Sequence, residues 1–184
     1  MNLEQIRNSI SSKINPFLSN NNETRLSSVL IIIFEDLPKI LMIKKPITMN
    51  YHGGEIAFPG GKISKEDGDL LDTAIRETRE ETGIIVNREE IIGQLKPVTT
   101  LNSGFTILPF ICMLNEIKEL TPNSEVDEFL EIPLMPLLQT LAKDLDQEHN
   151  SIQEMYTLTF EKHLIWGASA RMLKQITTKL GINE

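Results

Sequence analysis

The hydrophobic pattern of the chain begins with helical spacing and then changes to strand-like runs. Apolar residues recur every three or four positions at Leu3, Ile6, Ile10 and Ile14. This spacing predicts a short N-terminal helix that ends before Pro16, followed by a polar loop over residues 19–23. Branched residues then crowd into residues 26–34 and 40–43, which predicts two strands joined by a tight turn.

The clearest helical signal lies in the middle of the chain, after a glycine-rich segment. Residues 52–62, with the sequence HGGEIAFPGGK, contain too much glycine for a helix and are too mixed for one regular strand. Residues 69–82 have helical periodicity. Asp67 is the expected N-cap of this helix, and Gly83 is the residue expected to end it.

The rest of the chain predicts further strands and helices in mixed order. Strands are expected at residues 90–99, 105–114, 129–132 and 152–160, and helices at residues 136–145 and 166–180, the first of which would begin with proline. Because there is no regular βαβ alternation, the order favours an α+β fold or a mixed-sheet sandwich. No linker divides the 184 residues, so we expect a single domain over 1–184, with an N-terminal helix and loop (1–22) and a core of about residues 25–180.

Composition narrows the class of protein. The formal net charge of −8 excludes a generally basic surface of the kind that coats nucleic acid. No apolar run approaches the roughly 20 residues that span a bilayer, and the N-terminus lacks a secretory signal pattern. The single cysteine, Cys112, excludes an intramolecular disulfide and lies in an apolar run that predicts a buried strand residue. We therefore expect a cytoplasmic protein without nucleic-acid or membrane partners, as a monomer or a homodimer.

The negative charge is concentrated in two segments. Residues 61–90 contain nine acidic and five basic residues, and residues 115–131 contain six acidic residues and one basic residue. The remainder of the chain is close to neutral. Each segment is therefore either a solvated acidic face or part of a cation site.

Three carboxylates crowd one face of the central helix. Glu77, Glu80 and Glu81 stand at positions i, i+3 and i+4, where they repel one another and where the helix dipole also disfavours them. Solvent together with Arg76 and Arg79 would offset this repulsion on a hydrated face. A hard divalent cation would offset it at a metal site, because Mg²⁺ prefers oxygen ligands.

The glycine pair upstream of these glutamates favours the metal site, and the two features together carry a resemblance. Gly61 followed by residues 76–84, RETREETGI, resembles the Nudix box, the loop–helix–loop signature of Nudix hydrolases. Asp67 stands at the first acidic position of the box, eight residues rather than seven separate it from Arg76, and Thr78 stands where an aliphatic residue is usual. The resemblance implies a Nudix α/β/α sandwich with a mixed sheet, and hydrolysis of a diphosphate linked to a nucleoside.

A longer stretch resembles one branch of that family. Residues 54–61, GEIAFPGG, and the one-residue expansion of the box are similar to the coenzyme A diphosphatases, as are residues 165–171. Lys45-Pro46 and Asn50 depart from the pattern of the branch. The resemblance implies cleavage of coenzyme A or acyl-CoA to 3′,5′-ADP and (acyl-)4′-phosphopantetheine. The alternatives are ADP-ribose, NADH or a nucleoside triphosphate as substrate, or nucleotide binding without catalysis.

The resemblance also implies roles for the residues of the box. Glu77 and Glu81 are the expected ligands of Mg²⁺ or Mn²⁺, with Glu80 and the carbonyl of Gly61 as further ligands. Glu80 is also the expected general base. Arg76 is expected to orient the carboxylates through a bidentate pair rather than to touch the substrate.

Further candidates lie outside the box. In the second acidic segment, Glu125 and Glu128 could supply a distant glutamate to the site or could form a solvated turn, and we prefer Glu80 over Glu125 as the base. The other candidates for contacts with a nucleoside diphosphate substrate are Lys45, His52, Gly60, Lys62 and Phe105. Each also has an ordinary structural explanation, as an exposed lysine, a loop residue or a core phenylalanine.

Overall fold

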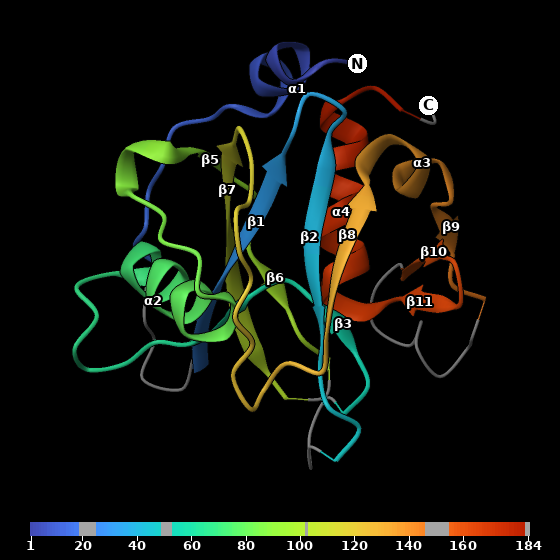
Figure 1. Ribbon diagram of the computed structural model, residues 1–184. Helices are drawn as coiled ribbons and strands as arrows, with labels where there is room; N and C mark the ends of the chain where they lie inside the picture. Colours follow the sequence, from blue (N-terminus) through green and yellow to red (C-terminus); the bar gives the residue numbers. More distant parts are fainter. Residues whose placement is uncertain (19–24, 49–52, 102, 146–154, 183–184) are drawn as a thin grey trace.

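The structure of the protein, a computed structural model, describes residues 1–18, 25–48, 53–101, 103–145 and 155–182 (Figure 1). The helices are α1 (Leu3–Ile10), α2 (Leu70–Thr82), α3 (Leu134–Gln139), α4 (Gly167–Lys179) and the 3₁₀ helix η1 (Arg88–Glu90). The strands are β1 (Arg25–Phe34), β2 (Lys39–Lys44), β3 (Ile56–Ala57), β4 (Gly60–Lys62), β5 (Ile91–Gln94), β6 (Val98–Thr99), β7 (Phe105–Leu114), β8 (Glu128–Pro133), β9 (Ala142–Lys143), β10 (Tyr156–Phe160) and β11 (His163–Ile165).

A mixed sheet forms the centre of the molecule, with the strand order β3-β2-β1-β7-β5. β1 and β7 pair in parallel along their whole length, from Arg25 opposite Phe105 to Phe34 opposite Leu114. The antiparallel neighbours β4, β6 and β8 pair with β1, β7 and β2 respectively, and β9, β10 and β11 form a smaller antiparallel sheet. The mixed α/β class predicted from the sequence is confirmed.

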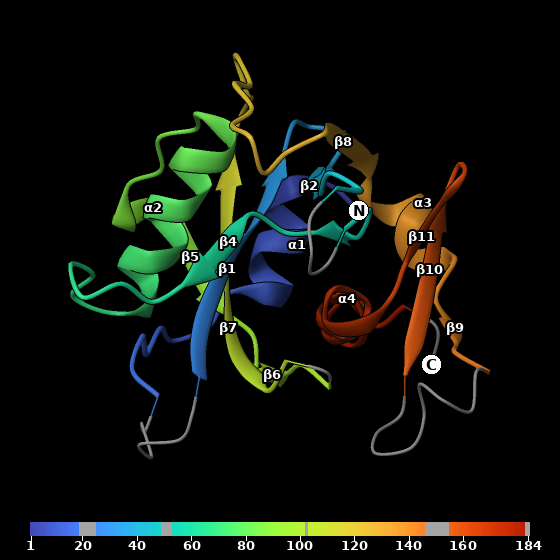
Figure 2. The same cartoon turned by 90° about the horizontal axis from the view of Figure 1, so that it is seen from below.

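Helices cover both faces of the central sheet. α2 lies on one face, α1 and α4 lie on the other, and the small sheet lies beyond α4 (Figures 1 and 2). Because successive side chains of a strand point to opposite faces, β1 sends Leu30 and Ile32 into the apolar cluster beneath α2. It sends Ile31 and Ile33 into the cluster beneath α1, α3 and α4. β1 therefore links the two halves of the core, and its N-terminal end lies beside the candidate site.

The cap predicted for the central helix is wrong by two residues. Asp69, not Asp67, is the N-cap of α2, because its Oδ1 accepts the N–H groups of Leu71 and Asp72, both at 2.9 Å. Gly83 ends the helix as expected, with a φ of 77° that favours glycine. Asp67 is left free for another role in the site.

Two other boundaries differ from the predictions for local reasons. The first helix ends at Ile10 and not just before Pro16, because the chain turns away to pair with β5, where Ser12 N–H donates to the Ile92 carbonyl at 3.1 Å. The strand expected at residues 90–99 is interrupted between β5 and β6, where Pro97 has no N–H to donate.

The helix expected at residues 136–145 is also misplaced. α3 begins at Leu134, whose N–H donates to the Pro38 carbonyl at 2.8 Å, so Pro136 is not its first residue. It ends at Gln139, and the chain then enters β9. The strand expected at residues 152–160 appears as β10, and residues 152–154 lie outside the described residues.

Two predictions about the interior and the membrane can also be compared with the structure. Cys112 is fully buried on β7, as its apolar surroundings predict. Over the part of the chain that the structure describes, no helix combines the length and the apolar character needed to cross a bilayer.

Candidate active site

Arg76 on α2 forms the centre of a charged network. Its Nε and Nη2 donate to the two carboxylate oxygens of Asp67, each at 2.9 Å, and its Nη1 donates to Glu77 at 2.9 Å and to Glu80 at 3.3 Å. The guanidinium lowers the pKa of Asp67 to about 2, against the opposing effect of burial. The bidentate pair of Arg76 is therefore made with Asp67, and it holds the guanidinium beside both glutamates.

Two glycines of β4 allow the strand to approach α2 and β1 closely. A Cβ on Gly61 would overlap the carboxylate of Glu77, and a Cβ on Gly60, whose φ is 154°, would overlap the backbone of β1. Burial raises the pKa of Glu77, although hydrogen bonding to Arg76 opposes the shift. Because both residues lack a side chain, the Gly61 backbone and the half-buried carboxylate of Glu77 lie side by side.

Glu81 is an almost fully buried carboxylate, with 1% of its surface exposed. Its Oε2 accepts the N–H of Gly60 at 2.8 Å, whereas its Oε1 has no hydrogen-bond partner among the described residues and lies 3.8 Å from Lys45 Nζ. Burial raises the pKa of Glu81 to about 7, with Lys45 and the Gly60 N–H opposing the shift. Because a buried polar atom without a partner costs free energy, a cation bound at this oxygen would stabilise the site.

Glu80 and Glu125 extend the acidic face. The side chain of Glu80 is 53% exposed and is held only by long hydrogen bonds to Arg76. The charge of Glu125 contributes to the raised pKa values of both Glu77 and Glu81, so the second acidic segment reaches the neighbourhood of α2. Glu128, the other candidate from that segment, instead forms an ion pair with Lys44 at 3.6 Å.

The oxygen donors around β4 and α2 fit a hard divalent cation. Within the described ranges, no three acidic, histidine or cysteine side chains converge into a ready-made metal cluster, and both Glu77 and Glu80 accept hydrogen bonds from Arg76. The buried Oε1 of Glu81 nevertheless lacks a hydrogen-bond partner among the described residues and has only Lys45, at 3.8 Å, as a positive neighbour. Glu77 lies against the Gly61 backbone. Carboxylate and carbonyl oxygens are the donors that Mg²⁺ and Mn²⁺ prefer.

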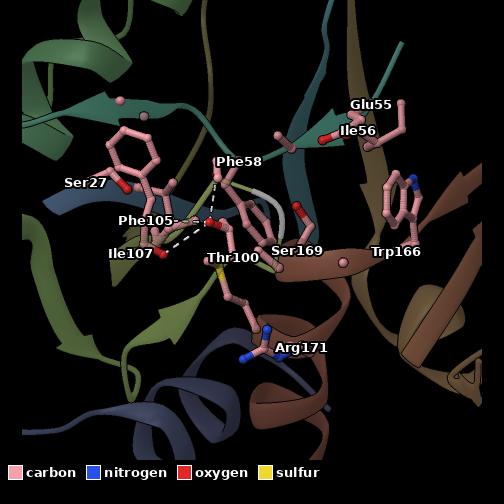
Figure 3. Close-up of a pocket in the computed structure, with 18 of the residues that line it drawn as sticks. Ser27, Glu55, Ile56, Phe58, Thr100, Phe105, Ile107, Trp166, Ser169 and Arg171 are labelled. Carbon is pink, nitrogen blue, oxygen red and sulfur yellow. Dashed lines mark hydrogen bonds between the residues drawn. The ribbon is translucent and has the colours of Figure 1, made fainter. Parts of the chain in front are cut away.

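A cavity of about 300 Å³ opens next to this face (Figure 3). Its walls come from β1, β3, β4, β7 and the first turn of α4. Among the described residues, the charged side chains that line the cavity are Lys45, Glu55, Lys62 and Arg171. The lining therefore carries three positive side chains and one negative one, although the whole protein has a net charge of −8. This local excess of positive charge favours the binding of an anion.

Several residues predicted to contact substrate do line the cavity. Phe105 is half-buried there instead of belonging to the core, and Lys62 Nζ lies 5.2 Å from the centroid of its ring. Lys45 and Gly60 both line the cavity and both contact Glu81, the first as an ion pair at 3.8 Å and the second through its N–H. His52 lies outside the described residues.

Sequence reasoning missed the wall of the cavity that faces β4. The start of α4 contributes Trp166, Ser169 and Arg171 to it (Figure 3). Met155, just before β10, also lines the cavity. Periodicity assigns residues 166–180 to a helix but does not indicate which of its sides faces a ligand. The similarity of residues 165–171 to one enzyme branch was the available signal.

Comparisons with known proteins identify the family and support the fold. The sequence profile of the NUDIX domain matches residues 24–156. The chain belongs to the Nudix family. It is 31% identical over 169 residues to the Nudix hydrolase NudL of Photorhabdus laumondii, covering 90% of this chain and 89% of that protein. The protein is therefore a Nudix hydrolase, which acts on nucleoside diphosphate derivatives, and hydrolases of this family generally use divalent metal ions.

Solved structures share the Nudix fold at low sequence identity. A MutT/nudix family protein from Enterococcus faecalis superimposes with a TM-score of 0.62 at 15% identity, covering 90% of this chain, and our chain spans only 65% of that protein. The NUDIX domain of Shewanella oneidensis NrtR, complexed with ADP ribose, has a TM-score of 0.52 at 18% identity, with 67% of this chain and 79% of that chain covered. These similarities support the same fold for this Nudix hydrolase.

Proposed function

We propose that this Nudix hydrolase cleaves the diphosphate bond of coenzyme A or acyl-CoA and releases 3′,5′-ADP and (acyl-)4′-phosphopantetheine, with Mg²⁺ or Mn²⁺ as cofactor. The observation that carries the proposal is the buried carboxylate of Glu81. One of its oxygens has no hydrogen-bond partner among the described residues, and it lies beside a cavity lined by cations. The coenzyme A specificity rests on the resemblance of residues 54–61 to that branch.

Glu77, Glu81 and the backbone of Gly61 would hold the metal, with Glu80 as a further ligand or as the residue that positions water. When bound, the metal neutralises the diphosphate, polarises its phosphorus–oxygen bonds and acidifies a water molecule. The N–H of Gly60 holds one oxygen of Glu81, and the other oxygen, which has no hydrogen-bond partner among the described residues, would be available to the metal.

The other residues position groups and move a proton. Glu80 is the proposed general base, because it is the more exposed and more loosely held of the two glutamates bonded to Arg76, so it can accept a proton from water. Arg76, fixed by Asp67, keeps Glu77 and Glu80 in place. Lys45 and Lys62 line the cavity next to β4 and would pair with the phosphate oxygens of the substrate.

ADP-ribose is the second candidate substrate. Lys45-Pro46 departs from the pattern of the coenzyme A branch, and Lys45 lies at the site itself, 3.8 Å from Glu81. The fold is shared with a Nudix domain that was solved with ADP ribose. The two substrates differ in what lies beyond the diphosphate, so a direct competition between them distinguishes the candidates.

The test is a product assay on the full chain with Mg²⁺ or Mn²⁺. Coenzyme A, ADP-ribose, NADH and a nucleoside triphosphate are supplied in parallel, and products are separated by chromatography. We expect 3′,5′-ADP from coenzyme A as the preferred reaction, and preference for another compound would reject the proposed specificity.

Matched variants test the assigned roles. Glu80→Gln should lower kcat by roughly 10²–10⁴-fold, as expected for a general base. Glu81→Gln should lower it by at least about a hundredfold through weaker metal binding. Glu89→Gln, on the exposed surface of η1, is the control and should leave turnover unchanged. Full activity of Glu80→Gln and Glu81→Gln would refute the metal mechanism, and activity of Glu80→Gln combined with loss in Glu125→Gln would move the base to Glu125.

A further inference from the structure

Lys45 lies at the boundary between the buried carboxylate of Glu81 and the cavity. Its Nζ is 3.8 Å from Oε1 of Glu81, and the side chain of Lys45 is 17% exposed, against 2% for the side chain of Glu81. The same lysine lines the cavity. One ammonium group therefore lies next to a proposed metal ligand and also next to the space that an anionic substrate would enter.

The contact between Lys45 and Glu81 is an ion pair without a hydrogen bond. A distance of 3.8 Å is beyond hydrogen-bond range, and Oε1 of Glu81 has no hydrogen-bond partner among the described residues. The ammonium group therefore offsets part of the negative charge and does not satisfy the oxygen. A divalent cation that coordinates Oε1 would do both, so it has the advantage over Lys45 at this oxygen.

The backbone of Lys45 is held on both sides, so a change of partner would involve its side chain alone. Its N–H donates to the Glu55 carbonyl and its own carbonyl accepts the N–H of Gly54, both at 3.0 Å. The four-carbon stem of a lysine is flexible, and its ammonium group carries three donors that rotate readily. Lys45 can therefore exchange a partner on α2 for one in the cavity without a movement of the backbone.

We propose that Lys45 competes with the divalent cation for Glu81, and that binding of the cation transfers the Lys45 ammonium group to the phosphate oxygens of the substrate. Two positive charges beside one carboxylate oxygen repel each other, and the repulsion is strong where water is largely excluded. A phosphate in the cavity offers the displaced ammonium group a charge-assisted hydrogen bond. Because such coupling is reciprocal, the phosphate also strengthens the binding of the cation.

This inference rests on the proposed function, because it takes Glu81 as a metal ligand. It deepens that function by giving Lys45 a second role, in which the lysine couples the binding of the cation to the binding of the substrate. Lys62, which also lines the cavity, is placed differently, because its Nζ lies over the ring of Phe105, 5.2 Å from the centroid. The coupling is therefore assigned to Lys45.

Calorimetry of Mg²⁺ binding to the full chain, without any nucleotide, tests the competition. The titration is made at pH 8.5, above the value of about 7 to which burial raises the pKa of Glu81, so that few protons compete with Mg²⁺. We expect Lys45→Met to bind Mg²⁺ about tenfold more tightly than wild type, because the competing charge is removed. Lys45→Arg keeps the charge and should bind Mg²⁺ as wild type does. Unchanged or weaker binding by Lys45→Met would overturn the proposal.

Lys44→Met is the matched control, one residue before Lys45. Lys44 carries the same charge, but its Nζ pairs with Asp127 at 3.4 Å and with Glu128 at 3.6 Å. Its replacement should leave the affinity for Mg²⁺ unchanged. An equal gain in the two methionine variants would make the effect one of net charge and would reject the competition. Thermal unfolding checks the fold of each variant, and Lys45→Gln repeats the test with a polar side chain if Lys45→Met is unstable.

Turnover at saturating Mg²⁺ tests the transfer of Lys45 to phosphate. The substrate is coenzyme A, or whichever compound the product assay shows to be cleaved. Lys45→Met should raise KM about tenfold, because the substrate loses an ammonium partner, although the same variant binds Mg²⁺ alone more tightly. A structural defect would weaken both kinds of binding, so only a residue shared by the two ligands gives these opposite changes. An unchanged KM would overturn the transfer.

Glu81→Gln distinguishes a failure of this inference from a failure of the proposed function. Loss of Mg²⁺ binding in Glu81→Gln, together with wild-type binding in Lys45→Met, would reject the competition and support the proposed metal site. Unchanged Mg²⁺ binding in Glu81→Gln would reject the metal site and the competition with it. Tighter Mg²⁺ binding in Lys45→Met, together with no cleavage of coenzyme A, would support the competition and reject the proposed substrate.

Discussion

The two ends of α2 hold their carboxylates in opposite electrostatic environments. Near the N-terminal end, Asp67 and Asp69 accept hydrogen bonds from arginines and from backbone N–H groups. These contacts lower the pKa of both carboxyl groups although burial acts in the other direction. Toward the C-terminal end, burial is the larger effect and raises the pKa values of Glu77 and Glu81.

The carboxylates near the N-terminal end are neutralised by arginines and stabilise the fold. The carboxylates toward the C-terminal end lack full compensation of their negative charge. Asp67 is stable as an anion because Arg76 neutralises it in a bidentate pair. Among the described residues, Glu81 has one N–H donor and a lysine at 3.8 Å, so its ionised form is costly in the absence of a further cation. A burial-raised pKa next to a cavity is a frequent mark of a functional site. Here it occurs on the helix that Asp67, its structural counterpart, immediately precedes.

Asp67→Asn tests the stabilising end and should have the largest effect on stability. The change removes the negative charge beside Arg76 while the shape of the side chain is preserved, so a buried ion pair loses one partner. We expect a loss of about 3 kcal/mol in the free energy of unfolding, measured with urea at pH 7. The loss should shrink as the pH falls from about 4 toward 2, because Asp67 has a lowered pKa and its stabilising contribution disappears as it is protonated.

Asp69→Asn is the matched control two residues further along the chain. Asparagine is as good an N-cap as aspartate, so the bonds to the N–H groups of Leu71 and Asp72 can be kept. We expect a much smaller loss of stability than for Asp67→Asn. Equal losses in the free energy of unfolding of the two variants would mean that the Asp67–Arg76 ion pair stabilises the fold no more than the contacts of Asp69 do.

Glu81→Gln tests the other end of α2 and should have the opposite sign. In metal-free buffer the wild-type free energy of unfolding should fall as the pH rises from about 5 to about 7, because the folded pKa of Glu81 is raised and the unfolded chain ionises more readily. The glutamine variant should lack this fall and be more stable than wild type by about 2 kcal/mol at pH 8. Added Mg²⁺ should stabilise wild type and not the variant, and parallel pH profiles for the two proteins would contradict this interpretation.

The same helix shows what the sequence could and could not predict. Helical spacing was sufficient to bring the three glutamates of α2 onto one side, because that geometry is local. The prediction of Asp67 as the N-cap was wrong, because Asp67 and Asp69 both precede the first apolar turn and spacing does not distinguish them. The choice depends on Arg76, which captures Asp67 from two turns further along, and that interaction is tertiary in character.

The cavity was harder still to predict, because its walls come from distant parts of the chain. Ser169 and Arg171 lie near the end of the chain, and their approach to β4 depends on the packing of α4 beneath the sheet. Phe105 begins a strand whose pattern is the same for a core residue and for a residue that lines a cavity. Local patterns therefore predicted the carboxylate face of the candidate site and did not predict the cavity wall that α4 contributes.

Thr78 and Thr82 provide a second comparison on α2, between a buried hydroxyl group without a hydrogen-bond partner and one that is hydrogen-bonded. Both are fully buried on α2, but Thr78 Oγ1 has no partner among the described residues, whereas Thr82 Oγ1 donates to the Thr78 carbonyl at 2.6 Å and accepts from the Ile84 N–H. Thr78→Val should therefore raise the free energy of unfolding by about 1 kcal/mol, because it replaces an unpaired hydroxyl with a methyl group. Thr82→Val should lower it by about the same amount, and a loss of stability in both variants would show that the Thr78 hydroxyl is satisfied in solution.

Arg88→Gln should have the smallest effect, although Arg88 makes the same kind of contact as Arg76. Its guanidinium pairs with Asp69 at 2.7 Å and also with Asp72, but its side chain is 46% exposed, against 29% for Arg76. Water and salt screen the exposed pair, and Asp69 keeps its role as the N-cap without it. We expect a loss of about 0.5 kcal/mol in low salt, measured by urea unfolding, that diminishes as salt is added. A loss as large as that of Asp67→Asn would mean that the number of ion pairs, and not their burial, sets the stability of this end of α2.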